Sequence, residues 1–141
     1  MTAIKEILVA IGLLNLLTIS SLDAQSLREL YNSGVVSAQR YERPLDITAP
    51  QWIKNILPNH CGVVVTLANS QRWLVHKGDQ FGKASQTVVV NARYMSSNWN
   101  LKSTRSVHNS RVTHFVSAGG RDYNALTDNC LHACDRMMSL S

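Results

Sequence analysis

The segment CGVVVTLANSQRWLVHK, residues 61–77, carries the clearest structural pattern in this chain of 141 residues. Two runs of β-branched and apolar residues, 61–67 and 72–77, are separated by the polar residues ANSQ. Runs of this kind, joined by a short polar connection, are typical of two antiparallel strands. The segment therefore predicts a β-hairpin, and the rest of the fold is predicted outward from it.

Two histidines belong to this hairpin, His60 at its start and His76 near its end. Side chains alternate between the two faces of a strand, so the loop length decides whether both rings share a face. A three-residue loop at 68–70 would oppose Gly62 to His76, and the imidazoles would then be diagonal neighbours, about 7–8 Å apart at the backbone. A two-residue loop would place them on opposite faces.

The remaining elements follow from shorter patterns. Further strands are predicted at 86–90 (QTVVV) and within 100–107, whereas 91–99 fits no single element. The polar, proline-containing stretch 35–49 predicts a loop. Helical segments are predicted at 27–33, where SLRE is a capping-box pattern, at 50–57, where Pro50 is the first helical residue, and at 112–118, which two glycines end.

A last helix is predicted to begin after Asp128 or Asn129, whose side-chain oxygens suit an N-terminal cap. Beyond the cap, one helical face carries Cys130, Ala133, Cys134 and Met137 at positions i, i+3, i+4 and i+7. This face is expected to pack on the sheet. The predicted fold class is α+β, with a small antiparallel sheet packed against a C-terminal, cysteine-bearing helix.

The N-terminal residues differ from the rest of the chain. Lys5 precedes the apolar run 7–19, and small and polar residues follow up to Ala24. This is the layout of a secretory signal, and it predicts a signal peptide at 1–24 and a secreted, extracellular protein. Two alternatives remain, a buried amphipathic helix and an uncleaved helix that anchors an intracellular protein to a membrane. After the signal, 25–59 is predicted as a helix and linker and 60–141 as the functional domain.

Composition limits the chain to one domain and narrows its partners. Hydrophobic residues make up 45% and charged residues 16%, the globular range. The net charge is +5, but its lysines and arginines are scattered, without the basic run and interleaved aromatics typical of nucleic-acid binding. We therefore expect a monomer with no nucleic-acid partner, and the charge allows weak contact with anionic surfaces such as lipid or cell wall.

The sequence holds three cysteines, Cys61, Cys130 and Cys134, so at least one thiol stays outside an intramolecular disulfide. Their spacing matches no zinc framework, and no metal site or cofactor is expected. Cys130 lies in the first turn of the predicted helix, where backbone amides and the helix dipole favour thiolate over thiol. Such a nucleophile needs a base, and the paired hairpin histidines are the candidates.

The order of these residues resembles a known superfamily. HCGVVV at 60–65, WLVH at 73–76 and YNALTDNCLH at 123–132 are similar to segments of the circularly permuted papain-like thiol enzymes. That group includes lecithin:retinol acyltransferase, the HRAS-like suppressor phospholipase/acyltransferases and, more distantly, the NlpC-type cell-wall peptidases. The resemblance covers about residues 60–138.

The resemblance implies the roles of the site residues. Cys130 would be the nucleophile, His60 the base and His76 the polar third member, and the amide of Cys130 would contribute to the oxyanion hole. Leu131 stands where the acyltransferases usually carry an acidic residue. The difference weakens a phospholipid assignment and leaves a lipid ester, a peptide or a cell-wall amide open as substrate.

The sequence therefore predicts a secreted, cysteine-dependent hydrolase or acyltransferase that works through an acyl-enzyme. The alternative is a catalytically inactive secreted binding or defence module on the same fold. It would apply if Cys130 were consumed in a disulfide with Cys134 or Cys61. A bridge to Cys61 is disfavoured, because strand neighbours point to opposite faces and His60 must face the thiol.

Overall fold

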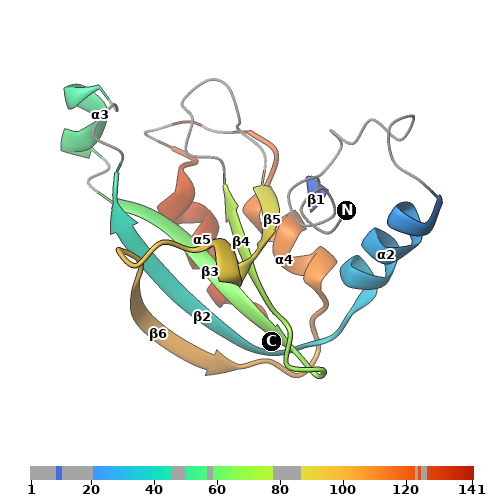
Figure 1. The fold of residues 1–141 in the computed structure, drawn as a ribbon. Helices are drawn as coiled ribbons and strands as arrows, with labels where there is room; N and C mark the ends of the chain where they lie inside the picture. Colours follow the sequence, from blue (N-terminus) through green and yellow to red (C-terminus); the bar gives the residue numbers. More distant parts are fainter. Residues whose placement is uncertain are drawn as a thin grey trace.

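In the computed structural model, six strands form one antiparallel sheet in the order β1-β5-β4-β3-β2-β6 (Figure 1). The residues described are 9–10, 21–45, 50–56, 59–77, 87–122, 124 and 127–141. The strands are β1 (Val9–Ala10), β2 (Val35–Pro44), β3 (Asn59–Leu67), β4 (Arg72–Lys77), β5 (Thr87–Asn91) and β6 (Asn100–Ser106).

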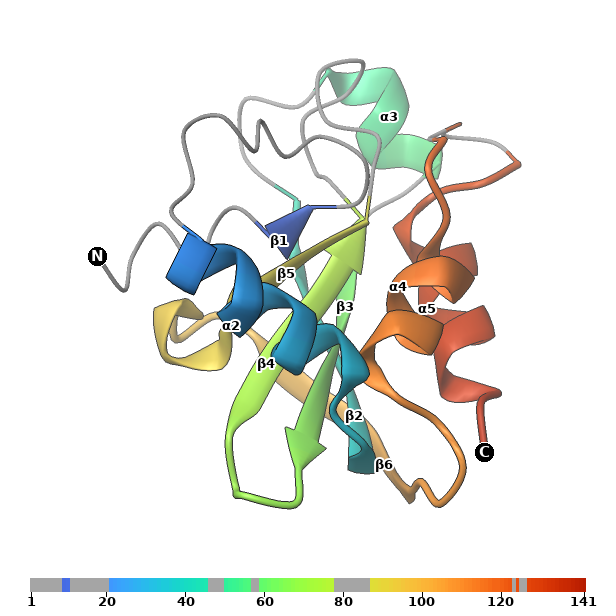
Figure 2. The same cartoon turned by 90° about the vertical axis from the view of Figure 1, so that its right-hand side faces the viewer.

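Helices cover one face of this sheet. α2 (Ser21–Asn32), α4 (Val112–Gly119) and α5 (Cys130–Met138) share one apolar core with strands β2 to β5. Figures 1 and 2 show α3 (Gln51–Ile56) apart from these helices, beyond the end of β2. The predicted α+β class, with the terminal helix on an antiparallel sheet, is confirmed. Among the described residues, no helix has the length and apolar character needed to cross a membrane.

The β3–β4 hairpin has a three-residue loop, the alternative that places both histidines on one face. Gly62 pairs with His76, and the amide of Leu67 donates to the carbonyl of Gln71 at 2.9 Å. Ser70 closes the loop with a φ of 72°, in the left-handed region that tight turns use. His60 and His76 therefore share a face of the sheet, as the odd loop length requires.

The predicted loop at 35–49 is wrong over most of its length, because 35–44 forms β2. This strand lies inside the sheet between β3 and β6. A register shift between Val35 and Ser37 interrupts the alternation of side chains that identifies a strand in a sequence. Many of its side chains are polar, so the sequence does not show the alternation of apolar and polar residues typical of a strand. In the structure these polar groups bond to partners on other elements. Residues 46–49 lie outside the described part of the chain.

The N-terminal helix begins earlier than predicted. α2 starts at Ser21, so Ser26 lies inside the helix and its capping-box pattern does not mark the start. Leu27 and Leu30 pack into the core from the second half of α2, so the helix is longer than the local cap signal indicates. The predicted cleavage after Ala24 falls within α2, and β1, which pairs with β5, falls within the predicted apolar run. Cleavage stays a prediction.

The other predicted elements are close to those observed. The third and fourth strands correspond to β5 and β6, and the turn after Pro50 is α3, where the amide of Lys54 donates to the Pro50 carbonyl at 3.1 Å. α4 ends at Gly119, and its C-terminal cap, Gly120, has a φ of 85°, which suits a residue without a side chain. The unassigned segment after β5 contains a 3₁₀ turn, η2 (Ala92–Tyr94).

Candidate active site

Asn129 caps the helix that carries the cysteine. Its side-chain oxygen accepts the amides of Leu131 at 2.9 Å and His132 at 3.2 Å. Nδ1 of His132 in turn accepts the Asn129 amide at 3.2 Å, which completes a capping box. The cap uses two of the amides in the first turn, so these two are not offered to an oxyanion. The amide of Cys130 is the one that the proposed oxyanion hole requires.

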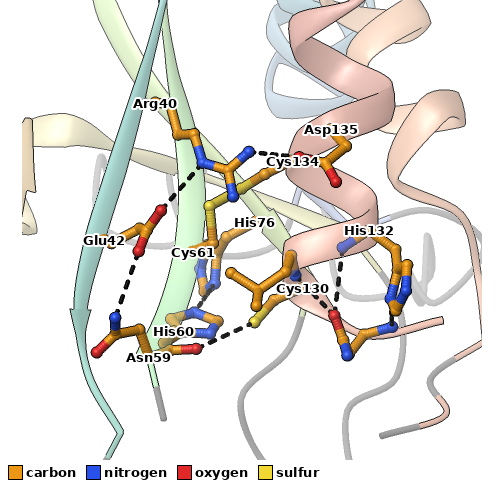
Figure 3. Close-up of a disulfide and its surroundings, with 12 residues drawn as sticks. Arg40, Glu42, Asn59, His60, Cys61, His76, Cys130, His132, Cys134 and Asp135 are labelled. Atoms are coloured by element: carbon orange, nitrogen blue, oxygen red, sulfur yellow. Dashed lines mark hydrogen bonds and ion pairs between the residues drawn. A yellow bond between two sulfur atoms is a disulfide. The ribbon is translucent and has the colours of Figure 1, made fainter. Parts of the chain in front are cut away.

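Cys130 is the first residue of α5 and is fully buried. The other two cysteines, Cys61 and Cys134, are joined in a disulfide, which leaves Cys130 as a thiol. Its Sγ lies 3.8 Å from the carbonyl oxygen of Asn59, in the peptide bond that precedes His60 (Figure 3). The thiol therefore meets β3 at the end of the strand where the first hairpin histidine stands.

The two hairpin histidines contact each other. Nε2 of His60 lies 3.1 Å from Nδ1 of His76, and the rings are edge to face with centroids 5.3 Å apart. One nitrogen donates and the other accepts, since a neutral imidazole has one of each. Because this contact occupies Nε2 of His60, Nδ1 can accept a proton from a nucleophile when His60 is the donor in it.

Gly62 makes this contact possible. A Cβ atom at position 62 would lie 2.7 Å from Cδ1 of Leu74 and 3.1 Å from Cβ of His76. Both distances are shorter than ordinary carbon–carbon contacts of about 3.5–4.0 Å. The glycine thus lets β4 bring His76 close to its neighbour.

The surroundings of His60 keep its ring neutral. The residue is 1% exposed, and its ring packs against Trp99 with centroids 5.5 Å apart. The guanidinium of Arg43 stacks over the same tryptophan at 5.1 Å. Burial first, and then the positive charge of His76 and Arg43, lowers the pKa of His60 well below its ordinary 6.5. At neutral pH the ring is therefore in the form that accepts a proton.

The helix and the histidine pair approach β3 from different sides. Cys61 bonds to α5, and its strand neighbour His60 points the other way, toward Trp99. Cys130 lies one helical turn before Cys134 and reaches the strand at Asn59. Figure 3 shows the sulfur pointing toward the end of β3 that carries His60.

A polar network centred on β2 supports the end of β3 that carries His60. Arg40 donates to Glu42 at 3.1 Å within β2 and forms an ion pair with Asp135 of α5. The side-chain amide of Asn59 donates to Glu42 at 3.4 Å. The network joins β2, β3 and α5 around the carbonyl that meets the thiol. The network could not be predicted from the sequence while 35–44 was expected to be a loop. The signal in the sequence is the pair of charged residues spaced two apart, Arg40 and Glu42, which share a face of a strand.

An ion pair connects Lys77, which follows His76, to Asp128, which precedes the cap residue Asn129. Lys77 is fully buried, and its ammonium lies 2.8 Å from the carboxylate of Asp128, which is also 2.8 Å from Arg136. Burial alone would raise the pKa of Asp128, but hydrogen bonds and attraction from Lys77 and Arg136 outweigh it and hold the pKa below its ordinary value. The ion pair holds the start of α5 against the end of β4.

A cavity of about 360 Å³ opens beside His76 on the face of the sheet that His60 occupies. Arg43, Tyr94, Met95 and Trp99 are among its lining residues. The segment 91–99, which fits no single element in the sequence, therefore lies beside the histidine pair. Tyr123, Ala125 and Leu126 of the motif that carries the resemblance lie outside the described residues.

Comparison of the chain with models of protein families, with characterised proteins and with solved structures finds no match.

Proposed function

We propose that this chain is a thiol hydrolase or acyltransferase of the circularly permuted papain-like kind, in which Cys130 forms the acyl-enzyme. The observation that carries the proposal is the meeting of a helix-terminal thiol with the end of β3. The Cys130 sulfur lies 3.8 Å from the Asn59 carbonyl, directly before a buried histidine whose ring contacts a second histidine. Nucleophile, base and orienting group would form a catalytic triad once the His60 ring, which points toward Trp99, reaches the thiol around the end of β3.

The histidine contact fixes how the base would work. To accept the thiol proton at Nδ1, His60 must carry its own hydrogen at Nε2 and donate it to Nδ1 of His76. The Cys130 thiolate then attacks the substrate carbonyl, and its sulfur forms a thioester as the carbon–leaving-group bond breaks. The imidazolium of His60 returns the proton to the leaving group, and water or another acceptor resolves the thioester.

The low pKa of His60 suits this role. A ring that is neutral at physiological pH is ready to accept a proton, and the negative charge of the reacting sulfur would stabilise the imidazolium against the burial and the neighbouring positive charges that lower its pKa. The cavity beside His76 is the proposed route for substrate to the histidine pair. Because Cys130 is fully buried, the proposal requires the sulfur to become exposed when substrate arrives.

The burial of Cys130 is also the observation that favours a second function. A binding or defence module on the same fold would keep the thiol as a small buried side chain and perform no turnover. The two functions differ in whether the thiol reacts as an activated nucleophile.

Export is part of the proposal. The Cys61–Cys134 disulfide supports it, because such bonds persist mainly in oxidising compartments outside the cytosol. Expression of the full chain with its first 24 residues, followed by intact-mass measurement of the secreted product, tests cleavage after Ala24. A product that retains these residues contradicts it.

Reaction with p-nitrophenyl acetate, an activated ester, tests the acyl-enzyme. We expect a burst of one p-nitrophenolate per chain and an acetyl group on Cys130 in the mass spectrum. Cys130→Ala should abolish the burst, and His60→Gln should slow it about 100-fold or more, the scale of a lost general base. His108→Gln, at an exposed histidine outside the site, is the matched control. A burst that survives Cys130→Ala, or no acetylation of wild type, favours the non-catalytic module.

A further inference from the structure

The disulfide joins the two elements that carry the proposed nucleophile and base. Cys61 directly follows His60 on β3, and Cys134 lies one helical turn after Cys130 on the same face of α5. Their Cα atoms are 6.4 Å apart, and both side chains are fully buried (Figure 3). The covalent bond thus lies within a few residues of the proposed reacting groups on both elements.

The non-covalent contacts between α5 and β3 are weaker constraints. The Cys130 thiol meets the Asn59 carbonyl at 3.8 Å, a long contact even for sulfur. Asp135, which pairs with Arg40 of β2, keeps 68% of its side chain exposed, and exposed pairs contribute about 0–1 kcal/mol. Apolar packing of Ala133 and Met137 is non-directional. These contacts hold the helix on the sheet, and the disulfide adds a covalent, directional restraint between α5 and β3.

The axial position of α5 matters for the proposed chemistry. A helix rises about 1.5 Å per residue, so a shift of one residue along its axis would move the Cys130 sulfur by about that distance. Misplacement of a reacting group by about 1 Å can cost about 100-fold in rate. The Lys77–Asp128 ion pair restrains the start of α5 against β4, whereas the disulfide restrains it against β3, the strand that carries His60.

We propose that the Cys61–Cys134 disulfide is a positioning element of the thiol site, so that Cys130 is an activated nucleophile only in the oxidised chain. The inference rests on the proposed function, since the position of the thiol matters in this way only if it reacts. Reduction by a dithiol such as dithiothreitol transfers two electrons and two protons to the S–S bond. It leaves thiols on Cys61 and Cys134 and a cyclic disulfide in the reagent, and α5 loses its covalent tie to β3.

The test measures the rate of Cys130 alkylation by iodoacetamide between pH 5 and 9, without reductant. In the oxidised wild type, Cys61 and Cys134 are protected and the reagent reports on Cys130 alone. The comparison is with Cys61→Ala/Cys134→Ala, in which Cys130 is again the one cysteine that reacts. Val65→Ala, which removes a fully buried side chain from the same face of β3 and keeps the disulfide, controls for lost stability.

The expected result is a wild-type inflection below pH 7. In the double variant the rate at pH 6.5 falls at least 10-fold, and the inflection moves toward about 8.5, the value of an ordinary thiol. Val65→Ala keeps the wild-type inflection.

Two other outcomes overturn the inference in distinguishable ways. A low inflection in both wild type and double variant shows that the disulfide does not position the thiol, while the proposed function stands. An ordinary inflection in wild type overturns the proposed function and this inference together. If circular dichroism shows the double alanine variant to be unfolded, Cys61→Val/Cys134→Ala, which restores part of the lost volume, takes its place with the same expected profile.

Discussion

Nε2 of His60 lies 3.1 Å from Nδ1 of His76, so the hydrogen of this contact fixes the tautomers of both rings. If His60 donates, its Nδ1 is unprotonated and can act as a base; if His76 donates, Nδ1 of His60 carries the hydrogen and cannot. His76 is thus proposed to act as an acceptor that holds its neighbour in the reactive tautomer.

Substitution of His76 should therefore slow acylation without unfolding the protein. His76→Phe keeps an aromatic ring but removes the acceptor, and we expect the p-nitrophenolate burst at pH 7 to slow by about 10- to 100-fold, the scale of a lost orienting partner. His76→Asn keeps a side-chain oxygen that can accept and should recover part of the rate. Stopped-flow absorbance measures both. Equal rates for the two variants would contradict an acceptor role.

The buried state of His60 predicts how stability depends on pH. Its pKa is lowered in the folded chain mainly by burial, whereas in the unfolded chain it returns to about 6.5. Between these two pKa values the unfolded state binds more protons, so the free energy of unfolding rises with pH. We expect the free energy of unfolding to fall as the pH drops below about 7. Above about 7.5, where His60 is neutral in both states, it should no longer change with pH through this residue.

Urea unfolding at pH 5, 6, 7 and 8 measures this dependence. Wild type and His60→Asn are compared at each pH, so that the difference reports on His60 and its contact with His76. The variant should lose less stability than wild type between pH 7 and 5. Parallel curves for the two chains would show that His60 does not carry the predicted linkage.

Much of the fold could be predicted because its signals are local. The β3–β4 hairpin follows from two apolar runs and a short loop, and its register follows from counting three loop residues. Asn129 and the glycines after α4 mark helix ends through their own backbone chemistry. The buried face of α5 follows from a helical spacing. None of these patterns requires knowledge of distant residues.

The missed features depend on partners far along the chain. β2 is a strand because β3 and β6 pair with it on both sides, and its polar residues are satisfied by groups that include Asp135, 95 residues beyond Arg40. The Cys61–Cys134 bond spans 73 residues, and three cysteines allow more than one pairing. Burial of Lys77 likewise needs Asp128 across the fold. Local sequence contains the residues of these interactions but not their proximity.

The close approach at Gly62 predicts a selective effect of a single methyl group. Gly62→Ala places a Cβ 2.7 Å from Leu74 and 3.1 Å from His76, and relief of such overpacking costs about 1–3 kcal/mol. The same methyl at Gly34 meets nothing within 4 Å, so Gly34→Ala is the matched control and should be near neutral. Urea midpoints give the stability, and the burst assay should show slower acylation for Gly62→Ala. Similar midpoints for the two variants would contradict the crowding.

The buried ion pair predicts an asymmetry between its two partners. Asp128→Asn leaves the fully buried ammonium of Lys77 without its carboxylate, a change that costs about 3–5 kcal/mol for a buried charge. Lys77→Met should cost less, because the carboxylate of Asp128 has 36% of its side chain exposed and keeps Arg136 as a partner. Lys77→Met/Asp128→Asn removes both charges and should be more stable than Asp128→Asn alone. Urea unfolding of the three variants measures the coupling between the pair, and additive losses would show that the two charges do not depend on each other.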